Sequence, residues 1–218
     1  MKTFKQYIEG IIDQAHELPD IPCDDVQKII VKTDTPFSSY NSRFDFAKRF
    51  SWSVLCKEAV DLIKKYARPP LFDVVAGTGY WAKELTQRGI PTISSDKFLG
   101  SKNKYGHVEK YHPIEEKDAI DVLNHIKKLS DNKEETGIHG DVLMAWPPYG
   151  EKIGEHIVSK MPIGSRLFYV GEGSGGATGN DEMHDLLRDK AKFKNLEVMH
   201  LPRFAGIHDT LFVYERIG

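Results

Sequence analysis

The sequence predicts an α/β protein with a helical N-terminal extension, and three observations lead to this fold class. Short apolar runs alternate with helical patterns after residue 70, which is typical of parallel strands joined by helices. A turn with two glycines follows the first run. Before that run, apolar residues recur only at helical spacing, and Pro69 and Pro70 end the region. We therefore expect an extension at 1–68, packed on the core or acting as a lid, and an α/β domain at 69–218.

The extension contains three helical patterns. Two short ones run from Phe4 to Ala15 and from Val26 to Ile30, and a polar loop follows at 33–42. A longer pattern from Asn41 to Ala67 predicts one continuous helix. We expect its beginning, from Arg43 to Trp52, to form part of a lid.

Seven strands and four helices are expected in the α/β domain. The predicted strands are Leu71–Ala76, Thr92–Ser95, Val108–Pro113, Asp141–Trp146, Arg166–Gly171, Leu196–Pro202 and Thr210–Arg216. The predicted helices are Trp81–Arg88, Asp118–Leu129, Glu151–Lys160 and Asp181–Lys192. Residues 131–136 are expected to form a charged loop. Because no helix separates the last two strands, the seventh strand should enter the sheet antiparallel to the others.

Composition narrows the class of protein. The chain has 218 residues, of which 28% are charged and 40% hydrophobic, as in ordinary globular proteins. A net charge of −2 argues against strong nonspecific binding of nucleic acid. Cys23 and Cys56 are widely spaced, which favours a reducing compartment. The sequence has no apolar run of membrane-spanning or signal-peptide length, so we expect a cytoplasmic protein without a membrane partner.

The glycine turn and a later acidic residue predict a nucleoside site. Gly77 and Gly79 allow the backbone to approach a ligand closely, and the helix that follows offers unpaired N–H groups. Asp96 comes directly after the second predicted strand, where a carboxylate can accept hydrogen bonds from both ribose hydroxyls. Strand, turn, helix and acid together are more specific than the glycines alone.

These residues resemble a known family. The segment from Asp73 to Gly79 is similar to the first motif of class I S-adenosylmethionine-dependent methyltransferases, and Asp96 resembles their second motif. The resemblance covers 71–218 and implies a Rossmann-like seven-stranded sheet of order 3-2-1-4-5-7-6, with S-adenosylmethionine as cofactor. The cofactor-binding residues that it implies are Asp73, Ala76, Gly77, Thr78, Gly79, Trp81, Asp96, Lys97 and Trp146. Val75 departs from the pattern, because the family usually has a glycine there.

Two alternatives stay open at this point. The segment from Gly77 to Ala82 also satisfies the dinucleotide pattern Gly-x-Gly-x-x-Gly/Ala, which is compatible with an NAD-dependent oxidoreductase. Val75, together with the replacement at Trp146 described next, is compatible with a protein that binds S-adenosylmethionine without transferring its methyl group.

A Trp-Pro-Pro-Tyr segment ends the fourth predicted strand. It is similar to the Asp/Asn-Pro-Pro-Tyr/Phe motif of methyltransferases that act on the amino groups of adenine or cytosine, with Trp146 in place of the acid or amide. The resemblance implies that Tyr149 stacks on the acceptor. Because proline fixes φ and lacks an N–H, we expect the carbonyls of Trp146 and Pro147 to point into the site. A simple strand stop with a core tryptophan is the alternative.

Three further residues are expected at the same edge of the sheet. Glu172 follows the fifth strand in a glycine-rich segment, and His208 and Asp209 precede the seventh. We expect them to manage charge during the reaction. The alternatives are a solvated loop for Glu172, and a turn residue and a surface imidazole for Asp209 and His208. His107 and His112 lack a metal-ligand spacing, so no metal is predicted.

The sequence thus predicts a methyltransferase that uses S-adenosylmethionine on an amine or nucleobase-like acceptor, with Trp146, Pro147, Tyr149, Glu172, His208 and Asp209 at the reacting centre. Together these motifs also resemble small methyltransferase-like proteins that have no assigned substrate. A small-molecule partner is favoured, and a nucleic-acid substrate stays open.

Overall fold

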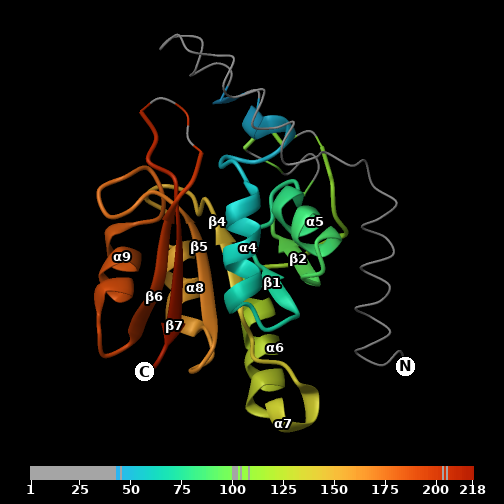
Figure 1. Cartoon of the computed structure of the whole chain (residues 1–218), viewed down its shortest axis with the longest axis vertical. Helices are drawn as coiled ribbons and strands as arrows, with labels where there is room; N and C mark the ends of the chain where they lie inside the picture. The colour runs from blue at the N-terminus through green and yellow to red at the C-terminus, as the bar shows by residue number, and fades with distance from the viewer. Residues whose placement is uncertain are drawn as a thin grey trace.

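One seven-stranded sheet organises the chain (Figure 1). The computed structural model describes residues 43, 44, 46–99, 103, 105–107, 109–202, 204 and 206–218. The strand order is β3-β2-β1-β4-β5-β7-β6. Strands β1 to β5 are parallel, whereas β7 is antiparallel to both β5 and β6. The strands are β1 Leu71–Asp73, β2 Thr92–Asp96, β3 Ile114–Glu116, β4 Val142–Ala145, β5 Arg166–Gly171, β6 Phe193–His200 and β7 Thr210–Arg216. The expected sheet order and antiparallel last strand are confirmed.

Helices cover both faces of the sheet (Figure 1). Helices α4 (Lys57–Tyr66) and α5 (Tyr80–Gln87) pack on one face, and α6 (Ala119–Asp131), α8 (Ile153–Lys160) and α9 (Asp181–Arg188) pack on the other. No helix within the described ranges is long and apolar enough to cross a membrane.

The core alternates between the two faces along each central strand. On β4, Leu143 belongs to the cluster beneath α4 and α5, whereas Val142 and Met144 belong to the cluster beneath α6, α8 and α9. Strand β5 does the same with Phe168 and Tyr169. This alternation follows from the two-residue period of a strand, and it buries apolar side chains on both faces.

The expected continuous helix from Asn41 to Ala67 is wrong. Residues 43, 44 and 46–49 are helical, the chain then leaves the helix, and α4 begins only at Lys57. Ser51 donates a side-chain hydrogen bond to the carbonyl of Ser53, a local bond that competes with helical pairing. Apolar residues keep a helical spacing beyond the end of this helix, because Phe50 and Val54 are buried although they are not helical.

The third strand was expected too early in the chain. Residues 111 and 112 pack against the glycine turn instead of pairing with β2: the N–H of Tyr111 donates to the carbonyl of Thr78 (2.8 Å). The imidazole of His112 lies in the core, 3.0 Å from the hydroxyl of Ser94. The strand therefore begins at Ile114.

Other boundaries shift by a few residues. The expected charged loop at 131–136 contains a short helix, α7 (Lys133–Thr136). Helix α9 ends at Arg188, which leaves room for β6 to begin at Phe193. The two short N-terminal helices, the loop at 33–42 and Cys23 lie outside the described residues. The division into an extension and a domain stays a prediction.

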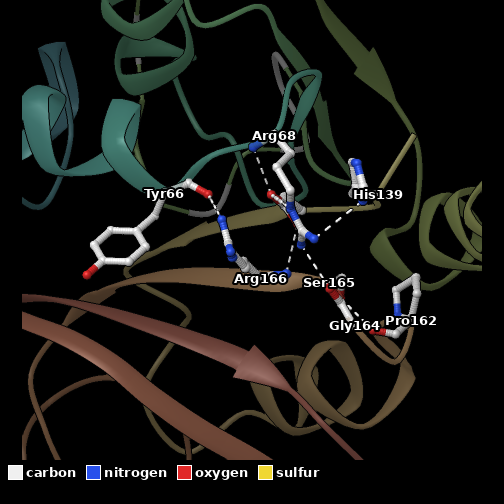
Figure 2. Close-up of polar contacts among 8 residues, drawn as sticks. Tyr66, Arg68, His139, Pro162, Gly164, Ser165 and Arg166 are labelled. Carbon is white, nitrogen blue, oxygen red and sulfur yellow. Dashed lines mark hydrogen bonds and ion pairs between the residues drawn. The ribbon is translucent and has the colours of Figure 1, made fainter. Parts of the chain in front are cut away.

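A polar network joins the amino ends of the central strands, away from the carboxyl ends where the glycine turn lies (Figure 2). The buried carboxylate of Asp141 accepts hydrogen bonds from the guanidinium and the N–H of Arg68 and from the N–H of Arg166. The same guanidinium also donates to the carbonyl of Gly164 (2.8 Å). The network anchors the segment before β1 to β4 and β5.

Candidate functional site

A cavity of about 450 Å³ opens at the carboxyl ends of β1, β2 and β4. Eight of the nine residues expected to hold the cofactor line it; the ninth, Gly79, does not. The eight are Asp73, Ala76, Gly77, Thr78, Trp81, Asp96, Lys97 and Trp146. The strand order reverses beside β1, because β2 and β3 lie on one side of it and β4 and β5 on the other. Such a reversal leaves a crevice at the carboxyl ends of the parallel strands.

The two glycines of the turn have different reasons to be glycine. Gly77 has a φ of 56° and lines the cavity, and a Cβ there would lie 3.0 Å from Nε2 of His107. Gly79 has a φ of 75°, and a Cβ there would come within 2.7 Å of Cβ of His112, so Gly79 serves packing. Only Gly77 brings bare backbone to the cavity.

Asp96 is tied to the glycine turn. One carboxylate oxygen accepts a hydrogen bond from the N–H of Gly77 (2.9 Å), and the other accepts from the N–H of Phe98 (2.8 Å). Burial raises the pKa of this carboxyl, and the two N–H groups oppose the rise. Each oxygen keeps a second lone pair, so the carboxylate can still accept from a ligand.

Asp73 is a buried carboxyl at the base of the cavity. Burial raises its pKa to about 8, and the charge of Asp96 adds to the shift. Among the described residues, its Oδ1 atom has no hydrogen-bond partner. A buried polar atom without a partner is costly, so a donor brought in by a ligand would stabilise it.

Trp146 is held in an unusual backbone conformation, with a φ of 53°. Its indole N–H donates to Oδ1 of Asp209 at 2.7 Å. Its ring stacks on Trp52, with centroids 5.9 Å apart and planes at 24°, and the guanidinium of Arg43 lies 4.2 Å from the centroid of the Trp146 ring. Residues 43 and 52, expected in a lid, therefore contact the Trp-Pro-Pro-Tyr segment.

The segment around Trp52 is fixed to the glycine turn. The hydroxyl of Thr78 donates to the carbonyl of Phe50, and the indole N–H of Trp81 lies 3.1 Å from the hydroxyl of Ser53. Residues 50 to 53 all line the cavity. The break in the long helix thus places this segment over the site.

The rest of the Trp-Pro-Pro-Tyr segment divides between core and cavity mouth. Pro147 is buried and does not line the cavity, and its carbonyl accepts from the N–H of Gly179 (3.0 Å) instead of pointing into the site as expected. Tyr149 does line the cavity and is 73% exposed, so its ring is available at the mouth.

Glu172, His208 and Asp209 do not line the cavity: Glu172 and Asp209 are buried, whereas His208 is exposed. The buried Glu172 carboxylate accepts from the N–H groups of Ala177 and His208, both at 2.7 Å, and thereby joins the glycine-rich loop to the β6–β7 hairpin. Asp209 is connected to the cavity through its hydrogen bond with Trp146. Burial raises the pKa of Asp209 to about 7, although the Trp146 indole and Arg43 lower it.

Several cavity residues were not singled out from the sequence. Asp118 was expected only as the first residue of a helix; its carboxylate caps α6 and accepts from Lys97 (2.9 Å). An aspartate at the start of a helical pattern is a common N-cap residue, and this sequence signal could have identified Asp118. Other lining residues that were missed as site residues include Ser51, Ser53, Phe98, Tyr105, His107 and Glu151. In the described ranges, no cluster of three or more His, Cys, Asp or Glu side chains is placed to hold a metal.

Comparison with known proteins gives structural likeness at low sequence identity. No family model and no curated protein match the chain. A SAM-dependent methyltransferase from Anabaena variabilis ATCC 29413 aligns over 91% of this chain and 97% of its own, with 15% identity and a TM-score of 0.49. A 1,6-didemethyltoxoflavin-N1-methyltransferase from Burkholderia thailandensis, crystallised with bound 1,6-didemethyltoxoflavin and S-adenosylhomocysteine, aligns over 92% of each chain, with 13% identity and a TM-score of 0.48. Magnesium protoporphyrin IX methyltransferase from Synechocystis PCC 6803 aligns over 98% of this chain and 92% of its own, with 14% identity and a TM-score of 0.44.

The order of the strands is more specific than these alignments. A sheet of order 3-2-1-4-5-7-6 differs from the dinucleotide-binding order 3-2-1-4-5-6 by the antiparallel strand inserted between the fifth and sixth. The resemblance of the sequence to class I S-adenosylmethionine-dependent methyltransferases implied this inserted antiparallel strand. The chain therefore has the fold of the class I S-adenosylmethionine-dependent methyltransferases.

Proposed function

We propose that this protein is an S-adenosylmethionine-dependent methyltransferase that acts on a planar amine or nucleobase-like acceptor. One observation carries the proposal: the Asp96 carboxylate and the glycine turn are hydrogen-bonded to each other at the floor of a cavity large enough for a nucleoside. The antiparallel seventh strand favours this cofactor over NAD.

The residues present fit the cofactor. Asp96 would hold the ribose, and Phe98 and Asp118 line the same cavity with a ring to stack on adenine and a carboxylate to accept from its amino group. The unpartnered Oδ1 of Asp73 would receive the ammonium of the methionine end, which satisfies a buried atom and favours the ionised carboxyl. When bound, the sulfonium supplies an activated methyl group.

The protein's own contribution is positioning. Methyl transfer needs the acceptor in line with the sulfonium at near-contact distance. Trp146 forms one wall, fixed by Asp209 and Trp52. Its indole has an N–H donor and no acceptor, so this side chain cannot accept a hydrogen bond from an amine. The exposed ring of Tyr149 would therefore hold a flat acceptor by stacking. Glu151 lines the same mouth and offers a carboxylate that can accept a proton.

Calorimetry and a label-transfer assay test the proposal together. The full chain should bind S-adenosylhomocysteine and not NAD. Methyl-labelled S-adenosylmethionine should then pass label to a planar amine in a panel of small heterocyclic amines and nucleobases. Binding of NAD alone would contradict the proposal. Cofactor binding with no labelled product from the panel or from cell extract would identify a binding protein without methyl transfer, the alternative that Val75 motivates.

A further inference from the structure

His107 is a cavity residue that neither the sequence motifs nor the proposed function uses. It follows β2 by eleven residues and lies against the glycine turn: a Cβ on Gly77 would be 3.0 Å from its Nε2 atom. The imidazole is half-buried, and Asp96 is the charged group that acts on it. Its ring therefore stands beside Gly77, whose N–H is hydrogen-bonded to Asp96, the residue proposed to hold the ribose.

The tautomer of His107 follows from its other nitrogen. Nδ1 lies 3.0 Å from the carbonyl oxygen of Ala47, and because a carbonyl only accepts, Nδ1 must carry the proton. Burial lowers the pKa of the imidazole, which favours the neutral ring. Nε2 is then a hydrogen-bond acceptor, and it makes no hydrogen bond to any residue that the structure describes.

We infer that His107 is a cofactor-binding residue whose Nε2 accepts a hydrogen bond from one ribose hydroxyl of the bound nucleoside, while Asp96 accepts from the other. The inference rests on the proposed function. Two acceptors beside Gly77 match the two adjacent donors of a ribose. The bond from Nδ1 to Ala47 additionally ties this contact to the helical segment at residues 46 to 49.

Two substitutions of His107 test the roles of its Nδ1 and Nε2 atoms separately. In His107→Asn the amide nitrogen can still donate to Ala47, but nothing replaces the Nε2 acceptor. In His107→Gln the longer side chain can carry its carbonyl oxygen to the Nε2 position. We expect His107→Asn to bind S-adenosylhomocysteine about 2- to 10-fold more weakly, the worth of one hydrogen bond, and His107→Gln to recover part of the loss. His125→Asn, at an exposed position on α6, is the matched control and should bind like the wild type.

The choice of ligand identifies the contact. 5′-Methylthioadenosine has the same ribose but no amino-acid end, so His107→Asn should lose the same factor toward it. Analogues that lack the 2′- or the 3′-hydroxyl should bind the wild type more weakly than the parent ligand does. The analogue that lacks the hydroxyl bonded to His107 should bind the wild type and His107→Asn with equal affinity. If His107→Asn loses affinity for S-adenosylhomocysteine but not for methylthioadenosine, the ribose assignment is overturned. It is also overturned if His107→Asn binds both ligands as tightly as the wild type does. Failure of the wild type to bind any of these ligands would instead contradict the proposed function. Thermal unfolding of each variant shows whether it is folded.

Discussion

The carboxylate of Asp209 accepts a 2.7 Å hydrogen bond from the indole N–H of Trp146, across 63 residues of sequence. Trp146 has a φ of 53°, a conformation that costs a bulky residue free energy unless its surroundings enforce it. Asp209 is itself held in place because Glu172 accepts from the N–H of His208 next to it. The β6–β7 hairpin therefore shapes the cavity wall without lining the cavity.

Removing this carboxylate should loosen the Trp146 ring. Asp209→Ala leaves the indole N–H without its acceptor and should lower the free energy of unfolding by about 1–3 kcal/mol. The near-ultraviolet circular dichroism from the Trp52–Trp146 stack should weaken, and methyl transfer should fall with it. Asp209→Asn keeps an oxygen acceptor and should retain the dichroism. An unchanged spectrum in Asp209→Ala would show that the hydrogen bond does not position the ring.

Asp96 should govern cofactor affinity. Asp96→Ala removes the proposed ribose acceptor together with the bonds to Gly77 and Phe98, and we expect S-adenosylhomocysteine binding to weaken by about 1–3 kcal/mol. Asp96→Asn keeps one oxygen and should lose less. Calorimetry measures both variants, and wild-type affinity in Asp96→Ala would remove the ribose contact from the proposal.

Asp73 should make stability depend on pH. Its pKa is about 8 in the folded protein and near the ordinary value of 3.8 when unfolded, so between these values the folded state binds the extra proton. The stability contributed by this group is therefore lost as pH rises from about 4 to about 8. Asp73→Asn cannot lose that proton, so its Tm advantage over the wild type should be larger at pH 8.5 than at pH 4.5.

A control carboxylate sharpens this comparison. Asp189 is partly exposed, and the N–H of Ala191 lowers its pKa, which is the opposite shift. Asp189→Asn should therefore show no Tm advantage that grows with pH. A Tm difference between Asp73→Asn and the wild type that stays constant across the pH range would contradict the raised pKa of Asp73.

The fold and half of the site were predictable because their signals are local in sequence. The turn at Gly77 and the acid at Asp96 sit at strand ends that apolar runs mark, and the missing helix before β7 showed its antiparallel direction. The pairing of Trp146 with Asp209 had no such signal. A hydrogen bond between residues 63 positions apart depends on how the hairpin packs.

The errors also have physical causes. Phe46, Phe50 and Val54 keep helical spacing although the chain leaves the helix between them, because burial alone satisfies an apolar pattern. Pro147 was expected to expose its carbonyl, but Gly179 supplies an N–H donor from the glycine-rich loop. Sequence spacing predicts which residues are buried better than it predicts what they contact.

A methyl group at Gly77 should separate folding from binding. Gly77→Ala puts alanine at a φ of 56° and brings its Cβ to 3.0 Å from His107, so we expect a loss of about 1–2 kcal/mol in stability and a clear loss of S-adenosylhomocysteine binding. Gly89→Ala is the matched control, because Gly89 has a φ of 84° and nothing within 4 Å of its Cβ. It should lose similar stability but bind normally; equal affinity in both variants would place the ligand elsewhere.

The network in Figure 2 should matter for stability and not for binding. Asp141 is fully buried and accepts from Arg68 at 2.6 Å, so Arg68→Met leaves a buried carboxylate without its main charged partner. We expect a loss of about 3–5 kcal/mol in urea unfolding, as for other broken buried ion pairs. The exposed Lys57–Asp61 pair is the control, and Lys57→Met should cost no more than about 0.5 kcal/mol. Because Arg68 lies at the amino ends of the strands, any folded Arg68→Met protein should bind S-adenosylhomocysteine like the wild type, and a selective loss of affinity would mean that the two ends of the sheet are coupled.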